Sequence, residues 1–264
     1  MLFAEEAKRQ GARVVAVALK GVTDVPALMA AADEVHPFAL GQVTGPLELL
    51  KKAGVKKVVM AGKVQHVSLF GGIIPDLRAV KILASLKDRR TDTILGALAD
   101  EFQKEGLELL SSATYLGHLI PGPGVLTRRR PTAEEEADAA LGWKAAKALA
   151  AADVGQSVVV QDKAVVAVEA MEGTDACVRR AAELVKSNGD KPRLVVVKVA
   201  KPKQDFRFDL PVLGLDTLKV LKECGATGLV FEAGKTLVFD RESFVKGADA
   251  QGLAVWALSG EAAG

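Results

Sequence analysis

Short valine-rich runs alternate with helix-like segments along this chain, and that alternation limits the fold more than any other feature. Strand-like runs are predicted at residues 13–19, 56–61, 107–111, 194–199, 228–232, 236–239 and 253–258. Helices are predicted at residues 2–10, 26–32, 42–52, 77–86, 91–104, 132–151, 174–186, 218–224 and 240–247. Buried strands joined by helical crossovers form parallel sheets, so the pattern predicts an α/β protein.

The segment 116–130, LGHLIPGPGVLTRRR, interrupts the alternation with Gly, Pro and three arginines and is typical of a linker. We therefore predict an N-terminal Rossmann-like parallel-sheet domain at 1–130 and a C-terminal mixed α/β domain at 131–264. The arginine run is interpreted as a solvated surface or a contact to an acidic partner. Because the first domain opens on a helix, we expect its first strand and a glycine-rich turn to be missing from the chain as given.

Composition excludes several classes of function. The 264 residues carry a net charge of +2, so no global field attracts nucleic acid. The two cysteines, Cys177 and Cys224, show no metal-ligand spacing and suit a reducing compartment. No apolar run approaches the roughly 18 residues of a membrane span. We expect a cytoplasmic protein that is at most peripheral to a membrane.

Local motifs predict the details of the second domain. Thr132 and Glu135 have the spacing of a capping box ahead of an Ala-rich helix. Residues 157–161 and 164–170 are predicted to form a hairpin that turns at Asp162-Lys163. Asp240 is predicted to cap a last helix that ends at Gly247.

The segment 198–217, KVAKPKQDFRFDLPVLGLDT, is the strongest candidate for function. Its prolines disfavour helix, and a long loop inside a compact domain is uncommon unless it has a task. Its interleaved lysines, arginine and aspartates suit a phosphate held together with a divalent metal. The alternative is a solvated connector held by salt bridges.

A second candidate lies where Gly173, Thr174 and Asp175 begin a helix, because free amides and the helix dipole favour an anion there. Glu169 and Glu172 lie nearby, and carboxylates beside an anion site imply a metal. Alternatively, Thr174 or Asp175 only caps the helix. The chain has three histidines, and they show no mutual spacing, so we expect oxygen ligands and Mg²⁺ or Mn²⁺.

A third candidate is the segment 66–76, HVSLFGGIIPD, which follows a strand-like run. Leu69, Phe70 and Ile73 are too apolar for an ordinary polar loop at the carboxyl end of a strand. They form either an apolar ligand groove or membrane-touching lip, or a part of the core.

Two stretches in this order, VEAMEGTDACVRRA at 168–181 and KPKQDFRFDLPVLGLDTL at 201–218, are specific. They resemble the signature stretches of the UDP-2,3-diacylglucosamine pyrophosphatases of the lipid A pathway, of the LpxI type and not the calcineurin-like type. The resemblance covers nearly the whole chain. It implies a two-domain, metal-dependent hydrolase at the inner membrane face that yields UMP and 2,3-diacylglucosamine 1-phosphate.

The resemblance places the aspartate of the family's R-x-D-L-P string at Asp209. Together with the motifs above, it implies Asp209, Asp175 and Glu172 as catalytic residues, with Asp209 and Asp175 as metal ligands. The expected substrate-binding residues are Thr174, Lys198, Lys201, Gln204, Arg207, Leu69, Phe70 and Ile73.

Two other classes of function stay open. One is a non-catalytic protein that binds a nucleotide sugar or glycolipid, and the other is a structural partner in a cell-envelope complex. Turnover of UDP-2,3-diacylglucosamine with added Mg²⁺ separates the enzyme from both. The sequence leaves a homodimer open and gives no acyl-chain preference.

Overall fold

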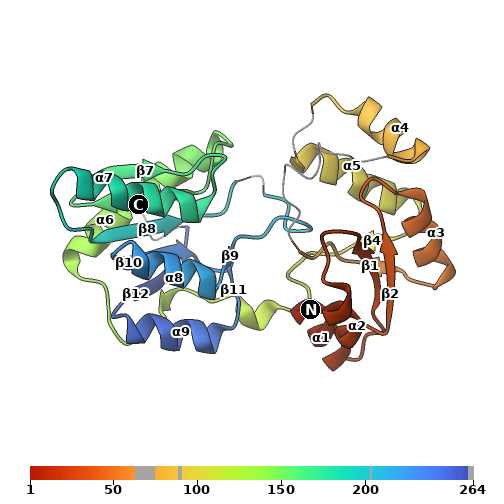
Figure 1. Ribbon diagram of the computed structural model, residues 1–264, viewed down its shortest axis with the longest axis horizontal. Coiled ribbons are helices and arrows are strands. Elements are labelled where there is room, and N and C mark those ends of the chain that lie inside the picture. The colour runs from red at the N-terminus through yellow and green to blue at the C-terminus, as the bar shows by residue number, and fades with distance from the viewer. Residues whose placement is uncertain (63–74, 89–90, 203, 261–264) are drawn as a thin grey trace. The chain divides into compact units, whose positions relative to one another are not determined.

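The structure, a computed structural model, describes residues 1–62, 75–88, 91–202 and 204–260 (Figure 1). The chain divides into two compact units. Unit 1 holds residues 1–116 and 205–209, and unit 2 holds residues 117–204 and 210–264. The chain therefore enters unit 1 a second time, in the middle of the polar segment 198–217. Leu69, Phe70 and Ile73 lie outside the described residues.

Unit 1 contains two parallel strand pairs with helices between the strands, as the alternating pattern predicts. Its elements are α1 (Leu2–Arg9), β1 (Val15–Leu19), α2 (Val25–Ala31), β2 (Glu34–Phe38), α3 (Thr44–Lys52), β3 (Lys57–Val58), α4 (Leu77–Ser85), α5 (Thr91–Lys104) and β4 (Glu108–Leu109). Strand β2 was not predicted because it contains Pro37. Among the residues that the structure describes it pairs only with β1, and an edge strand tolerates proline.

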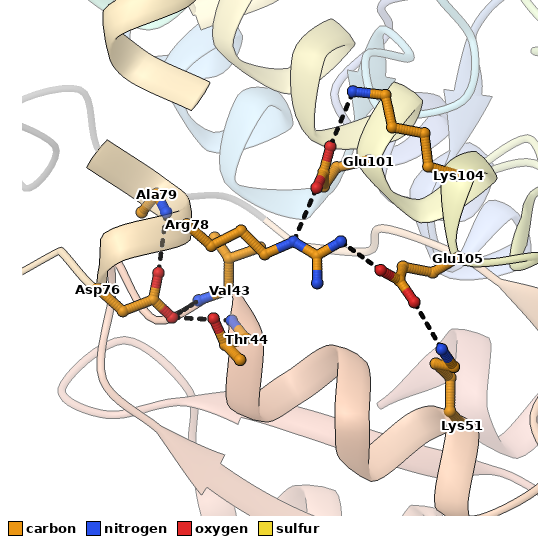
Figure 2. A network of polar contacts seen from close by, with 9 residues as sticks. All are labelled: Val43, Thr44, Lys51, Asp76, Arg78, Ala79, Glu101, Lys104 and Glu105. Atoms are coloured by element: carbon orange, nitrogen blue, oxygen red, sulfur yellow. Dashed lines mark hydrogen bonds and ion pairs between the residues drawn. The ribbon is translucent and has the colours of Figure 1, made fainter. Parts of the chain in front are cut away.

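Packing and polar contacts together hold the helices of unit 1. Leu47, Leu50, Phe102 and Leu107 form a buried cluster between α3, α5 and the residue before β4. Asp76 lies at the N-cap of α4, where its carboxylate accepts the amide of Ala79 at 2.8 Å. The same carboxylate accepts the amides of Val43 and Thr44 at 2.9 and 2.8 Å, so it joins the starts of α3 and α4 (Figure 2).

Unit 2 is organised around a six-stranded mixed sheet in the order β5-β12-β10-β8-β6-β7. Strands β8, β10 and β12 run parallel, while β5, β6 and β7 pair antiparallel with their neighbours. Its elements are η2 (Gly117–Leu119), β5 (Gly124–Val125), α6 (Ala133–Ala151), β6 (Ser157–Gln161), β7 (Ala164–Val168), α7 (Thr174–Ser187), β8 (Leu194–Lys198), β9 (Val212–Leu213), α8 (Leu215–Glu223), β10 (Ala226–Glu232), β11 (Leu237–Val238), α9 (Arg241–Ala250) and β12 (Ala254–Leu258).

Helices cover both faces of this sheet. Val195 and Val197 of β8 join a buried cluster with α6, while Leu194 and Val196 join a cluster with α7, α8 and α9. Burial on both faces explains why β8 is an unbroken apolar run up to its last residue. A side chain at Gly142 of α6 would lie 2.5 Å from Val197, so glycine is required for this close packing.

Two local predictions for unit 2 are confirmed. The capping box at Thr132 and Glu135 is present. The hairpin turns at Asp162 and Lys163, which have φ values of 51° and 60°. Asp138 of α6 accepts both turn amides, at 3.0 and 2.6 Å, and this stabilises the left-handed pair.

Two other interpretations were wrong in part. Asp240 occupies the N-cap position of α9 with φ of 46° but makes no side-chain capping bond, and the helix runs on to Ala250. The solvated surface expected for the arginine run holds for Arg128 and Arg130, which are exposed, but not for Arg129, whose guanidinium binds Glu135 at 2.8 and 2.9 Å. It also donates to the Gly252 carbonyl at 2.5 Å and to the Thr227 carbonyl of β10, so it fastens the start of α6 to the sheet.

Candidate functional site

The carboxyl ends of the parallel strands of unit 2 carry buried charged side chains. Strand β8 ends at Lys198 and its neighbour β10 ends at Glu232, with exposed fractions of 8% and 1%. The antiparallel strand β6 begins at Ser157, which pairs with Lys198 in the sheet. Ligands of open α/β sheets gather at this edge. A buried lysine and glutamate at the ends of two apolar strands thus make this edge the candidate site.

Thr174, the first residue of α7, is the centre of one polar cluster at this edge. Its hydroxyl donates to Glu169 Oε1 at 3.0 Å and accepts from Lys198 Nζ at 3.1 Å. The Ser157 hydroxyl lies 3.0 Å away. A threonine hydroxyl has one proton and two acceptor sites, so Ser157 must be the donor to Thr174. The hydroxyl therefore links the buried lysine to the buried glutamate.

The start of α7 keeps its amide end free of side-chain caps. The N-cap residue is Gly173, with φ of 83°, and no side chain makes a capping bond there. The alternative that Thr174 or Asp175 is present only as the N-cap is therefore wrong. The Thr174 side chain instead turns toward Glu169 and Lys198. An uncapped helix start beside a buried lysine suits an anion such as a phosphate.

Glu232 forms a second polar cluster at the same edge. Its Oε2 atom accepts from Lys147 Nζ at 2.5 Å and from the Ala200 amide at 2.9 Å, and its Oε1 atom accepts from Lys235 Nζ at 2.9 Å. Burial acts to raise the pKa of Glu232, but these hydrogen bonds outweigh burial and lower that pKa below its ordinary value. The Ala200 contact fixes the backbone two residues after Lys198.

The start of the polar segment stays within unit 2 and is tied locally. Lys201 Nζ pairs with Asp153 at 2.7 Å, and the Lys201 amide donates to Gln204 Oε1 at 2.8 Å. Lys198 Nζ also donates to the Val212 carbonyl of β9 at 3.4 Å. Segment 198–217 is thus mainly a loop, as predicted, with β9 as a short strand that was not expected. Its last three residues, 215–217, belong to α8, which begins earlier than the predicted residue 218.

The middle of the segment, residues 205–209, belongs to unit 1. The Phe206 carbonyl accepts from the Ser112 amide at 2.9 Å and from the hydroxyls of Ser111 and Ser112 at 3.0 and 3.1 Å. The Arg207 guanidinium binds both carboxylate oxygens of Asp205, at 2.6 to 3.0 Å. This pairing lowers the pKa of Asp205.

Arg207 also lies with its guanidinium carbon 5.9 Å from the centre of the Phe208 ring. The Asp209 amide donates to the Asp205 carbonyl at 2.9 Å, which closes a tight turn that carries Asp209. Thus the structure gathers Arg207 and Asp209 in unit 1, and Thr174, Lys198, Lys201 and Gln204 in unit 2.

Glu172 has a partner of its own. It pairs with Arg180 at 2.6 Å and accepts the Ala170 amide at 2.9 Å, so it holds the turn before α7. The hydrogen bond from Arg180 lowers the pKa of Glu172. Asp175 lies in the first turn of the same helix.

The described residues form no cluster of three or more His, Cys, Asp or Glu side chains that could hold a metal. Single carboxylates such as Asp209 and Asp175 have the hard oxygen atoms that Mg²⁺ prefers. The donor chemistry therefore fits a divalent cation, while a complete set of ligands is not assembled within the described ranges.

Sequence reasoning missed three side chains of this edge, namely Ser157, Glu232 and Lys147. A signal for Glu232 was available, because it is the one charged residue of strand β10. Buried charges are rare unless they are paired, so a glutamate that ends a buried strand indicates partners elsewhere. In the part of the chain that the structure describes, no helix has the length and apolarity to cross a bilayer.

Comparison with known proteins confirms the resemblance seen in the sequence. A family model described as the LpxI N-terminal domain matches residues 1–119, and one described as the LpxI C-terminal domain matches residues 122–256. The UDP-2,3-diacylglucosamine pyrophosphatase LpxI of Caulobacter vibrioides is 35% identical over 222 residues, which cover 82% of this chain and 79% of that protein. The first match covers residues 1–116 of unit 1, and the second covers most of unit 2 together with residues 205–209 of unit 1. The chain therefore belongs to the LpxI family.

Proposed function

We propose that the protein hydrolyses the pyrophosphate bond of UDP-2,3-diacylglucosamine in lipid A biosynthesis. The observation that carries this proposal is the likeness to the Caulobacter vibrioides pyrophosphatase over 82% of the chain. A water oxygen attacks the phosphorus on the sugar side, and the bond from that phosphorus to the bridging oxygen breaks. UMP leaves with the bridging oxygen and its electron pair, and the water oxygen ends in 2,3-diacylglucosamine 1-phosphate.

The cluster at the start of α7 suits the charge of this substrate. Lys198 supplies one buried positive charge, and the uncapped amides of α7 supply a partial one. Thr174 holds Lys198 in place through the 3.1 Å hydrogen bond. Charges fixed in advance stabilise a transition state better than mobile surface charges, since they need no reorganisation. We assign Lys198 and Thr174 to phosphate binding, with Lys201 and Gln204 on the adjoining loop.

Asp209 is the proposed catalytic carboxylate, because the tight turn at Asp205 fixes its backbone. Its role is to hold a cation or to orient the attacking water. Asp175 is assigned the second metal-binding role, and Mg²⁺ or Mn²⁺ would supply neutralisation of phosphate charge when bound. Asp209 and Asp175 belong to different units, so each role is tested by its own substitution. Glu172 has a smaller part, since Arg180 already engages it.

Three finer proposals complete the assignment. Unit 1 is Rossmann-like, as its parallel pairs with intervening helices support. The apolar residues Leu69, Phe70 and Ile73 meet the acyl chains. The protein works at the cytoplasmic face of the inner membrane, where a substrate with two acyl chains is anchored.

Hydrolysis in ¹⁸O-labelled water tests the reaction and its direction together. Mass spectrometry should show the label in 2,3-diacylglucosamine 1-phosphate and none in UMP. Asp209→Asn should lower kcat by on the order of 10²-fold or more, because the charge is lost while the shape is kept. Asp216→Asn is the matched control, since Asp216 is exposed on α8 and pairs with Lys219, which is exposed as well.

Label in UMP would overturn the direction of attack. Substrate that binds tightly without turnover would favour the non-catalytic binding protein. A folded Asp209→Asn protein with normal turnover would remove Asp209 from the reaction.

A further inference from the structure

Helix α4 of unit 1 is attached to its neighbours mainly by charged side chains. Arg78 donates to Glu101 of α5 at 2.7 Å and also binds Glu105, which in turn pairs with Lys51 of α3 (Figure 2). Asp76 fastens the start of the helix to the start of α3. Burial acts to raise the pKa of Asp76, but its backbone hydrogen bonds lower that pKa to about 2. The Asp76 carboxylate therefore stays ionised at physiological pH.

The opposite side of α4 is apolar and faces solvent. Leu77, Val80 and Leu83 are 82%, 47% and 41% exposed, and Ala84 is exposed as well. At about 100° per residue, these four positions fall within about 120° of the helix circumference. Ala79, which is buried, lies on the other side. A surface helix normally turns its apolar stripe toward the core, so this arrangement is reversed.

Lysines border this apolar stripe, and acidic residues are absent from the helix itself. Lys81 is exposed and lies about 40° beyond Leu77, at one edge of the stripe, and Lys87 is exposed two residues after the helix ends at Ser85. The sequence of α4, LRAVKILAS, contains no Asp or Glu. Long lysine side chains at the edges of an apolar stripe can lie along it and place their ammonium groups in a layer of negative headgroups.

We propose that α4 docks in the plane of an anionic phospholipid bilayer, with Leu77, Val80, Leu83 and Ala84 among the upper acyl chains. This rests on the proposed function, because a substrate with two acyl chains brings the enzyme to a bilayer. The charges favour a lipid surface over a second copy of this chain. In a two-fold symmetric contact the same stripe meets itself, so the positive charge beside the stripe would be doubled, and α4 has no acidic residue to offset it.

Co-sedimentation of the purified full chain with vesicles tests the proposal. Vesicles of phosphatidylglycerol and phosphatidylcholine should bind the protein, and vesicles of phosphatidylcholine alone should bind it far less. Lys81→Glu with Lys87→Glu should weaken partition into the anionic vesicles by roughly tenfold or more, since each cation near such a surface contributes about one factor of five. Leu77→Ser with Val80→Ser should cause a loss of roughly tenfold or more.

The control is Met29→Ser on α2, because Met29 is also a large exposed apolar side chain of unit 1, at 63%. It should bind vesicles like the unchanged protein. The lysine variant keeps the apolar residues, so it tests the surface even if the serine variant loses its fold. Both α4 variants should hydrolyse a water-soluble substrate analogue with short acyl chains at the normal rate.

Different failures have different signatures. Anionic vesicle binding that the lysine variant retains in full would overturn the proposal. A change of oligomeric state in the α4 variants, measured by light scattering, would assign the stripe to a second copy instead. Equal loss on the short-chain analogue would place the stripe in the substrate site. If the unchanged protein binds vesicles through α4 but hydrolyses nothing, the proposed function falls and the docking surface stands.

Discussion

Glu232 offers a direct measure of how much the buried edge of unit 2 depends on charge. The perturbation is Glu232→Gln, which keeps the shape of the side chain and removes its charge. Glu232 is 1% exposed and accepts three hydrogen bonds, from Lys147, Lys235 and the Ala200 amide. In the variant one amide oxygen still serves Ala200 and Lys147, while the new NH₂ group faces Lys235.

The expected loss of stability follows from these contacts. Lys147 and Lys235 have side chains that are 31% and 46% exposed, so both can turn toward water after the change. No buried cation is then left unpaired, and the full penalty of about 3–5 kcal/mol for a broken buried pair does not apply. Weakening hydrogen bonds that are each worth about 1.5–3 kcal/mol gives an expected loss of about 2–3 kcal/mol in the free energy of unfolding.

Urea denaturation followed by tryptophan fluorescence measures this loss. Glu242→Gln is the matched control, because Glu242 pairs with Lys246 on α9 with both side chains exposed, at 80% and 71%. Exposed helix pairs of this spacing contribute only about 0.3–0.5 kcal/mol. A loss in Glu232→Gln no larger than in this control would refute the reasoning.

The pH dependence gives a second check. The pKa of Glu232 is lower in the folded protein than its ordinary value of 4.5. Its contribution to stability is therefore present above pH 4.5 and is lost as the pH falls through the lowered pKa. The stability difference between the unchanged protein and Glu232→Gln should stay constant from pH 7 to pH 5.5 and shrink in more acidic buffer. A difference that stays the same in acid would show that the charge does not cause it.

Two further predictions concern the site. Lys198→Met should lower kcat/KM by about 10²-fold or more through loss of a fixed charge. It should also cost about 1–3 kcal/mol of stability, because it removes a donor to Thr174. Adding Glu169→Gln should restore stability and not activity, and a double variant that recovers both would show that the cluster is purely structural. Prolonged treatment with a chelator should abolish turnover, and Mg²⁺ or Mn²⁺ should restore it, whereas chelated protein that works at the untreated rate would exclude the cation.

Local sequence signals predicted the parts of the fold that depend on neighbouring residues. The turn at Asp162-Lys163 and the capping box at Thr132 follow from short-range chemistry, and both are present. Strand β5 was missed because its two residues lie in a Gly- and Pro-rich segment, and only pairing with β12 makes them a strand. A contact so distant along the chain leaves no local pattern.

The same limit applies to the site. The start of α7 could be predicted because glycine before a helix is a local signal. Arg207 has an aspartate two residues away on each side, Asp205 and Asp209. The structure pairs it with Asp205, and the spacing in the sequence alone does not distinguish the two. The link between Glu232 and Lys147 spans 85 residues, and only the folded sheet brings them together.

The return of residues 205–209 to unit 1 has a consequence for the order of events at the ribosome. Domains generally fold as they are synthesised, with the N-terminal one first. Here Ser111 and Ser112 acquire their acceptor, the Phe206 carbonyl, only after 94 more residues beyond Ser112 have been made. By then four of the six strands of the unit 2 sheet, β5 to β8, have already been translated. Unit 1, which is the first to begin folding, is thus unable to finish until much of unit 2 has been synthesised. A nascent chain halted before residue 205 lacks a part of unit 1.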